Sequence, residues 1–546
     1  MVDIALKLEG INRNVGTHAA GVIIANGPIT EYVPVQRVVR KADNEDGDDA
    51  KGDIAVTTQW EMGVLEKIGM LKMDFLGLRT LTLIDNTLKL IKKTRGEDID
   101  VYKLPLDDKG VYQLLQRGDA KGVFQLESEG IRELLKRMKP DNIRDLIAVL
   151  ALYRPGPLEG GMVDEYVECK HGRRKPVYPH PLMEEILSET YGVMVYQEQV
   201  MRILNRLGGI DLAKAYACIK AISKKNHTII NARKADFIAG SIERGMDQAK
   251  AEEIFDLIVF FGGYGFNKSH TAAYAQIGYQ TAYLKHHYPA EFMAALLSSE
   301  IDDGNKRDML VDHIADARKL GIEVLPPDVN RGVADFDVQN NRIIFGLTAI
   351  KGLGRGAAEE IVRARDAGGK FKDLYDFCER IDRRIVPKAA VQRMVQAGAF
   401  DVFGRRSAHF AAVDKAYQTA DERAADRRRG QKSFLDMFDS GDETNGDGAH
   451  TADHGLPEVP EWPETETLKF EKEALDFYMS SHPLAQHDEQ LRRFRTHECA
   501  EMVKVKPGSD GRVGGMIVEL QVRTANKGRN LGRKYATFRI EDFSGT

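Results

Sequence analysis

The sequence predicts a multidomain α+β protein, for three reasons. Short apolar runs punctuated by glycine, such as Gly21 to Ala25, indicate strands near the beginning of the chain. From about Leu81 to Ser299, apolar residues recur every three or four positions, which is typical of amphipathic helices. Beyond Arg512, alternating apolar and polar residues indicate strands again. A chain of 546 residues, 42% of them hydrophobic, is long enough to bury several cores.

Residues 1–80 are expected to form a small mixed α/β unit, and the apolar run from Leu71 to Thr80 is its most informative segment. In an extended strand, residues two apart face the same way, so Lys72 and Asp74 project from one surface. A carboxylate beside an ammonium group suits a metal-bound phosphate. The alternative is a core strand that carries a surface aspartate by chance.

Residues 81–330 are expected to form a large helical domain. Its segment from Tyr264 to His270 contains a glycine that permits an irregular turn. There Tyr264 offers a ring that can stack on a base or sugar, and Lys268 and His270 can meet phosphates. The alternative is a buried tyrosine and histidine that cap a helix.

Residues 331–405 are expected to form a tandem helix-hairpin-helix region. In the first copy, Gly352 and Gly354 permit a tight hairpin between two short helices. Amides freed at the start of the next helix can hold a DNA phosphate without reading the base sequence, and Lys351 and Arg355 flank this point. A plain helix-turn-helix packing unit is the alternative, and it suits the weaker second copy better than the first.

Residues 406–505 change character, because low hydrophobicity and scattered charge cannot sustain a core. The segment is therefore expected to be largely a linker. It contains an apolar peptide from Gln431 to Phe438, and isolated apolar residues in such a tract usually need a partner's pocket. Residues 506–546 are predicted to be strands joined by a basic turn. They resemble the start of an OB-fold whose five strands cannot close before Thr546.

The amino-acid composition limits the functions and the locations that the sequence allows. The net charge is only −5, so nucleic-acid binding must come from local basic patches. Four distant cysteines form no Cys-x-x-Cys pair, which argues against a zinc site or a disulfide framework and fits a reducing cytoplasm. No signal peptide opens the sequence and no apolar run is long enough to span a bilayer, so a cytoplasmic location without membrane contact is expected.

Several motifs, read in order, resemble one family. They are the run around Asp74 and the segments Gly122 to Ser128, Tyr153 to Pro157, Tyr191 to Gln199 and Tyr264 to His270. Together they resemble the catalytic alpha subunits of bacterial DNA polymerase III, the C-family replicative polymerases, over nearly the whole chain. For the fold, this resemblance implies a partial nucleotidyltransferase-type palm, helical fingers, tandem helix-hairpin-helix motifs and an incomplete OB-fold.

For function, the resemblance implies a DNA-directed DNA polymerase that extends a primer 3′ end with deoxynucleoside triphosphates, using two Mg²⁺ ions. Asp74 matches the last of the family's three catalytic aspartates and would bind metal. Lys72 matches a lysine that faces the incoming triphosphate. The other two aspartates lie in an Asp-x-Asp motif that in the family precedes everything in this sequence. The sequence is therefore expected to be a fragment lacking the first half of the palm and the phosphoesterase-type domain.

Three Asp-x-Asp pairs do occur in the chain, but none has the flanking residues of the family motif. Each is expected to lie on a solvated loop or strand face. The pairs are Asp46/Asp48, Asp98/Asp100 and Asp335/Asp337.

Two further sets of residues are carried over from the family. Lys220 and Lys224 lie in a segment that contacts the triphosphate in the family, where many relatives have paired arginines. A lysine ammonium lacks the two-pronged hydrogen bonding of arginine, so these residues would contact the triphosphate only as point charges. The apolar peptide resembles the family's sliding-clamp-binding peptide, although no register fits cleanly. Its expected contact residues are Gln431, Leu435, Met437 and Phe438.

The expected partners are primer-template DNA, deoxynucleoside triphosphates, the beta sliding clamp and other replicase subunits. Two other functions remain open. The first is a non-catalytic portion of a split polymerase that binds DNA and tethers the clamp. The second is a repair protein that reuses hairpin and OB modules, but it predicts an adenylation lysine motif or an acidic nuclease cluster, and the sequence contains neither.

Overall fold

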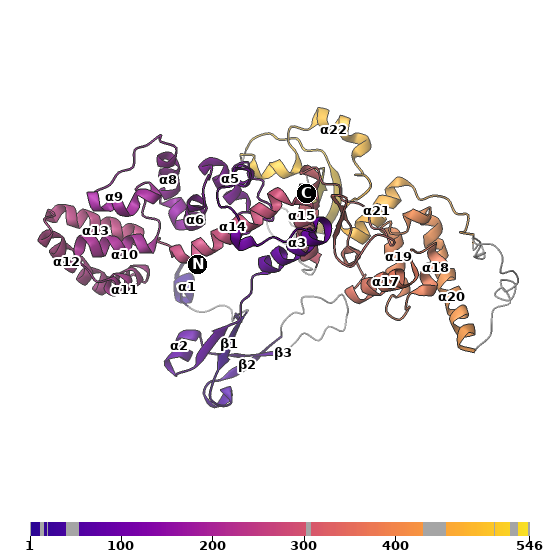
Figure 1. Ribbon diagram of the computed structural model, residues 1–546, viewed down its shortest axis with the longest axis horizontal. Coiled ribbons are helices and arrows are strands. Elements are labelled where there is room, and N and C mark those ends of the chain that lie inside the picture. The colour runs from indigo at the N-terminus through magenta and orange to yellow at the C-terminus, as the bar shows by residue number, and fades with distance from the viewer. Residues whose placement is uncertain are drawn as a thin grey trace. The chain divides into compact units, whose positions relative to one another are not determined.

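The computed structural model describes residues 2–10, 16–18, 20–39, 54–301, 307–429, 455–506, 508–524 and 533–543. The chain is mainly helical (Figure 1). It forms two compact units. The first comprises Met1–Tyr288 and Ser299–Arg307, and the second comprises Pro289–Ser298 and Asp308–Thr546. The expected helical region of residues 81–330 therefore contributes to both units. Within the described residues, no helix has the length and apolar character needed to cross a membrane.

The first unit begins with a strand region of two small antiparallel ladders. Strand β1 (Gly21–Ile24) pairs with β4 (Leu71–Asp74), and β2 (Val35–Val39) pairs with β3 (Ile54–Thr58). Helix α1 (Val2–Leu8) precedes them, and α2 (Met62–Lys67) leads into β4. The buried core of this region is small and consists of Val33, Leu65 and Met70.

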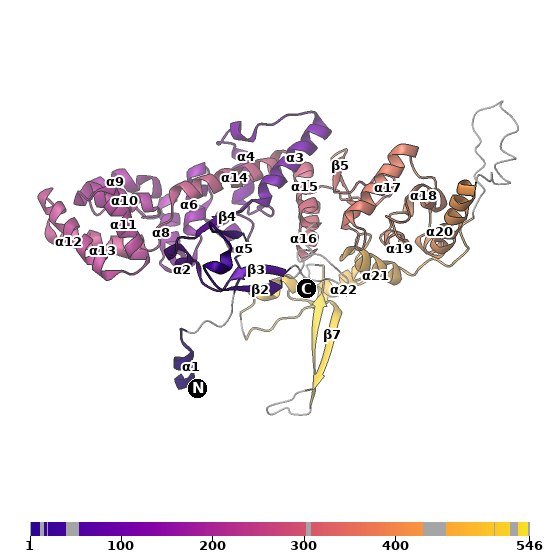
Figure 2. The same cartoon turned by 90° about the horizontal axis from the view of Figure 1, so that it is seen from below.

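The rest of the first unit is helical, as the apolar periodicity predicts. Its helices are α3 (Arg79–Arg95), α4 (Lys109–Gln116), α5 (Glu129–Met138), α6 (Ile143–Leu152), α7 (Pro155–Glu159), α8 (Met162–Lys170), α9 (Pro181–Leu187), α10 (Gln197–Gly208), α11 (Leu212–Ser223), α12 (His227–Glu243), α13 (Gln248–Gly262) and α14 (Lys268–His287). One core joins α4, α5, α6, α8 and α14. A second joins α9 to α13, which form a separate bundle in both views (Figures 1 and 2).

The second unit contains the expected hairpin region and the terminal strands. Its elements are α15 (Pro289–Ile301), α16 (Arg307–Lys319), β5 (Asp337–Gln339), β6 (Arg342–Ile344), η4 (Leu347–Ala349), α17 (Arg355–Gly368), α18 (Leu374–Arg380), α19 (Lys388–Gln396), α20 (Arg406–Arg429), α21 (Glu464–Leu475), α22 (Asp488–Phe494), β7 (Met516–Thr524) and β8 (Lys534–Glu541). Strands β7 and β8 pair antiparallel, in agreement with the predicted alternation. The OB-fold itself stays a prediction.

Helices α20, α21 and α22 lie in the segment that was expected to be largely a linker. Helix α20 packs on α18 and α19, and α21 packs on α19. A stripe of small residues on α20 is buried, including Ala408, Ala412 and Ala416. Alanine adds little to mean hydropathy, but it packs closely and favours helix. The composition of the segment therefore did not predict this helix. The predicted clamp peptide, with Gln431, Leu435, Met437 and Phe438, lies outside the described residues.

Candidate nucleotide and DNA sites

Strand β4 brings Lys72 and Asp74 together on one face, as predicted. The Lys72 Nζ lies 2.8 Å from Asp74 Oδ1. The hydrogen bond from Lys72 holds the pKa of Asp74 below its ordinary value, so the carboxylate is ionised at neutral pH. The Asp74 side chain is 45% exposed and therefore accessible to a cation or a phosphate-bound metal.

The segment just before the neighbouring strand β1 supplies a third polar group, His18. His18 Nδ1 accepts hydrogen bonds from the backbone N–H groups of Gly21, at 2.7 Å, and of Ala20, at 3.2 Å. Its Nδ1 lone pair is thus occupied by amides, and the 3.9 Å approach to Asp74 is not an ion pair in this arrangement. Since His18 fixes the turn that enters β1, its contacts indicate a positioning role.

Gly21 permits the close approach of these groups. It pairs with Asp74 across the ladder. A β-carbon at Gly21 would lie 2.5 Å from Lys72 Cε, 2.9 Å from His18 Nδ1 and 3.1 Å from Asp74 Oδ1. Any other residue here would push the Lys72 side chain away.

The start of α14 carries Lys268, the second predicted phosphate contact. Lys268 Nζ lies 2.7 and 2.8 Å from the two carboxylate oxygens of Glu189. Its backbone N–H donates to Glu198, and its ammonium lies 5.2 Å from the centre of the Tyr196 ring. In this structure Lys268 is held by acidic partners, so phosphate would have to compete with Glu189 for it.

The aromatic residues around this helix start are packed against one another. The Tyr264 ring lies on Gly156, where a β-carbon would be only 2.2 Å away, yet Tyr264 remains 40% exposed. His270 packs on the Tyr274 ring at 4.1 Å between centroids. Asn267 caps the helix by accepting the His270 N–H at 2.9 Å. The expected irregular turn is therefore present, and one face of Tyr264 is already covered by protein.

Lys220 and Lys224 lie at the end of α11. The Lys220 ammonium lies 4.6 Å from the centre of the Tyr216 ring, and both lysines are exposed. Lys224 is the C-terminal cap of α11. Both residues are thus presented to solvent on the bundle of helices α9 to α13, where they are open to anionic ligands.

The hairpin of the second unit has the predicted backbone. Gly352 has a φ of +78°, which favours glycine, and Gly354 is the N-cap of α17 without a side-chain cap. Gly354, Arg355 and Gly356 are exposed, and a β-carbon at Gly354 would meet nothing within 4 Å, so the start of α17 is accessible to a ligand. Lys351 and Arg355 are both engaged by carboxylates, of Asp476 and Asp335 respectively.

The second copy of the pattern differs from the first. Its helix α19 starts after Pro387, and the segment before it contains turns that follow α18. Lys388 pairs with Asp414 on α20 at 2.6 Å. These contacts fit the helix-turn-helix packing unit that the sequence left as the alternative for this copy.

The remaining Asp-x-Asp pairs have structural roles. Asp100 caps a short 3₁₀ turn, and Asp98 pairs with Lys92 at 3.0 Å. Asp335 forms a bidentate pair with Arg355. The expectation of a solvated face is wrong for Asp337, which is 4% exposed because its side chain points inward from β5. Asp46 and Asp48 lie outside the described residues.

The comparisons with known proteins agree with this arrangement. Residues 1–77 match the bacterial DNA polymerase III alpha NTPase domain, residues 80–245 match the bacterial DNA polymerase III alpha subunit finger domain, and residues 321–409 match a helix-hairpin-helix motif. The strand region, the helical region and the hairpin thus have the domain order of a replicative polymerase subunit.

Relatives that align with nearly the whole chain identify the family. The chain is 40% identical to the DNA polymerase III subunit alpha of Thermus aquaticus over 100% of its own length and 42% of the relative. It is 40% identical to that of Vibrio cholerae and 38% identical to that of Escherichia coli K12, over 97% of its length and 45% of each relative. The chain belongs to the DNA polymerase III alpha subunit family, and it spans a little under half the length of these relatives.

Proposed function

We propose that this chain is the part of a replicative DNA polymerase that contributes Asp74 and Lys72 to nucleotidyl transfer onto a primer 3′-OH. The observation that carries this proposal is the 2.8 Å pair of Lys72 and Asp74 on β4, inside the segment that matches the polymerase NTPase domain. The family implies metal-dependent catalysis, and we propose Mg²⁺ as the metal. Deoxynucleoside triphosphates and primer-template DNA are the proposed substrates.

Asp74 fits the role of one metal ligand, because it is ionised and accessible. Bound Mg²⁺ would stabilise negative charge on the oxygens that attack and leave in phosphoryl transfer. Lys72 would neutralise the triphosphate beside this carboxylate, and His18 and Gly21 would keep the two side chains in register. On the helical region, Lys268, His270, Lys220 and Lys224 are the proposed phosphate contacts, with Tyr264 beside the base or sugar.

DNA binding by the second unit would rest mainly on the backbone. The amides at the accessible start of α17 can hold a phosphate, and a helix N-terminus favours negative charge. Lys351 and Arg355 would contact DNA by exchanging their present carboxylate partners for phosphate. This interaction would be independent of base sequence and strongly dependent on salt.

Primer extension tests the catalytic proposal directly. This chain, joined to a palm segment of the family that carries the Asp-x-Asp motif, is incubated with primed template, Mg²⁺ and all four triphosphates. The variants are Asp74→Asn and the control Asp85→Asn, an exposed aspartate on α3 that pairs with Lys89. We expect extension to fall by about 10³-fold in Asp74→Asn, because a direct metal ligand is lost, and to persist in Asp85→Asn. Extension that survives in Asp74→Asn would refute the assignment of Asp74.

A second candidate function is a non-catalytic portion that binds DNA and tethers the sliding clamp. It is favoured by one observation: among the described residues, Asp74 belongs to no group of three metal-ligating side chains. Two metal ions need several carboxylates. This candidate predicts no extension by the wild-type chain, retained binding to primed DNA, and clamp binding that is lost when Leu435 and Phe438 are both replaced by alanine.

A further inference from the structure

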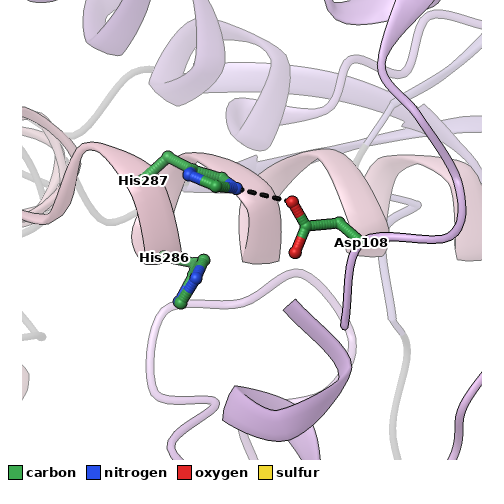
Figure 3. A group of neighbouring side chains, drawn as sticks. All are labelled: Asp108, His286 and His287. Carbon is green, nitrogen blue, oxygen red and sulfur yellow. Dashed lines mark hydrogen bonds and ion pairs between the residues drawn. The ribbon is translucent and has the colours of Figure 1, made fainter. Parts of the chain in front are cut away.

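The end of α14 opposite to Lys268 brings two imidazoles and a carboxylate together (Figure 3). His286 and His287 come from the last turn of this helix, and Asp108 precedes α4. Each offers one ligand atom, and these atoms lie within 4.8 Å of one another. In the part of the chain that the structure describes, this is the one such group of three. His287 Nε2 already lies 2.8 Å from Asp108 Oδ2.

Hydrogen bonds of its side chain and of its backbone hold Asp108 in place. Its Oδ1 accepts the backbone N–H groups of Gly110, at 2.8 Å, and Val111, at 3.1 Å, as the N-cap of α4. Its own N–H donates to the Tyr279 hydroxyl at 3.3 Å, and that hydroxyl donates to the carbonyl of Pro105. The cap leaves Oδ2 directed at α14. The carboxylate is therefore oriented before any ligand binds.

Gly110 makes room for the second imidazole. A β-carbon at this position would lie 2.2 Å from His286 Nε2 and 2.8 Å from His286 Cε1, a contact that no real side chain tolerates. The His286 ring therefore rests on bare backbone in the first turn of α4, two residues after the Asp108 cap. A single glycine thus decides that His286 and Asp108 can share one small space.

We propose that Asp108, His286 and His287 bind a divalent metal ion of the zinc class. Two imidazole nitrogens and one carboxylate oxygen are donors that Zn²⁺ accepts, with a water in the fourth position. Tetrahedral ligands about 2.0–2.1 Å from Zn²⁺ lie about 3.3 Å apart. The ligand atoms of His287 and Asp108, 2.8 Å apart, are slightly closer than this spacing. All three ligand atoms lie within 4.8 Å of one another, so small side-chain rotations would bring them to the tetrahedral spacing.

The electrostatic setting supports a cation at this point. The last turn of a 20-residue helix carries partial negative charge, and His286 and His287 lie in that turn. The bound ion would join the loop before α4 to the end of α14, the helix whose other end carries Lys268. The proposed site does not depend on the polymerase proposal, since none of its three residues is among the predicted nucleotide or DNA contacts.

A Zn²⁺ titration of the metal-free full chain tests the proposal, with binding followed by calorimetry and by the melting temperature Tm. The variants are Asp108→Asn, His286→Ala and His287→Ala, and Gly110→Ala moves His286 without removing a ligand. Asparagine is as good an N-cap as aspartate, so Asp108→Asn preserves α4 while it removes the charge. His227→Ala, at an exposed histidine on α12, is the control for unspecific surface binding.

We expect Zn²⁺ to raise the Tm of the wild-type chain and of His227→Ala, because a ligand of the folded state stabilises it. Each of the three ligand variants should weaken Zn²⁺ binding by about 100-fold or more, since loss of an outer-shell partner alone typically costs 10–100-fold. Gly110→Ala should weaken it by about 10-fold. Tetrahedral absorption from Co²⁺ should appear in the wild-type chain and vanish in the ligand variants.

Equal Zn²⁺ affinity in the wild-type chain and the three ligand variants would overturn the proposal. So would the absence of any Zn²⁺-dependent rise in Tm for the wild-type chain. If His287→Ala and Asp108→Asn lose binding but His286→Ala does not, the three-ligand site is wrong, and Asp108 and His287 form only a hydrogen-bonded pair with an adventitious ion.

Discussion

The strand region, residues 20–77, and the helical region, residues 79–288, both carry residues proposed to handle nucleotide, but they hold them differently. In the strand region, Lys72 is fixed by Asp74 two positions away and by the facing strand β1. In the helical region, Lys268 is fixed by Glu189 and Glu198, which are 79 and 70 residues away in sequence. The first arrangement is local, and the second requires the whole fold.

The two regions also differ in how much apolar surface anchors them. On β1 and β4, the face opposite to Lys72 and Asp74 exposes Val22, Ile24, Leu71 and Met73, each at 43% or more. The helical region instead buries two large cores. Since burial of apolar area is the main stabilising term, the strand region should open more easily than the helices.

Hydrogen exchange would test this difference, which should be the largest effect. Amides of β4 should exchange about 10³-fold faster than those in the centre of α14, because local opening costs far less free energy than global unfolding. Mass spectrometry of peptides covering 70–76 and 275–284 provides the measurement. Equal protection of the two segments would mean that the strand region is anchored by more than its visible core.

The helical region should depend strongly on a buried ion pair that has no equivalent among the described residues of the strand region. Lys170 Nζ on α8 lies 2.7 Å from Asp145 Oδ2 on α6, and the two side chains are only 6% and 2% exposed. Although burial opposes the charge, the hydrogen bond to Asp145 raises the pKa of Lys170. Lys170→Met should therefore lower the free energy of unfolding by about 3 kcal/mol, measured by urea denaturation, because it leaves a buried carboxylate without its cation.

Lys250→Met is the matched control, since Lys250 forms an exposed pair with Glu253. That variant should change the free energy of unfolding by less than about 1 kcal/mol. Similar losses in both variants would show that the buried pair is no more important than a surface pair.

Replacing Lys268 should weaken nucleotide binding but change the stability of the fold little. Its pair with Glu189 is about one-third exposed, so Lys268→Met should cost less than about 1 kcal/mol of stability. Binding of a fluorescent deoxynucleoside triphosphate should weaken by about 10-fold, because a charge-assisted contact to phosphate is lost. Lys234→Met is the control, since Lys234 is exposed to a similar degree as Lys268 and pairs with Asp256. Unchanged nucleotide binding in Lys268→Met would assign Lys268 a structural role alone.

Gly21→Ala should produce the smallest effect, confined to the strand region. The new β-carbon would displace Lys72 from Asp74, so the pKa of Asp74 should rise back toward its ordinary value, because the hydrogen bond from Lys72 is what lowers it. Carboxyl ¹³C titration of labelled aspartate measures this change. Gly63→Ala on α2, where a β-carbon meets only one atom at 3.9 Å, should leave the Asp74 titration unaltered. An unshifted Asp74 in Gly21→Ala would mean that Lys72 does not depend on this glycine.

Much of the fold was predictable from patterns of short range. The helices of residues 81–299, the β4 strand and the hairpin at Gly352 follow from periodicity and from glycine positions. Helix α20 was not predictable from hydropathy, because its buried face is built of alanine. Asp337 was misassigned because alternation alone does not show which face of a short strand is covered.

By itself, the sequence determined the family and the common face of Lys72 and Asp74, because both rest on residues close together in the chain. Only the tertiary structure decided the acidic partners of Lys268, the carboxylates on Lys351 and Arg355, and the meeting of Asp108 with His286 and His287. These contacts join residues far apart in sequence. Their formation depends on how helices pack, and no spacing within one segment records that.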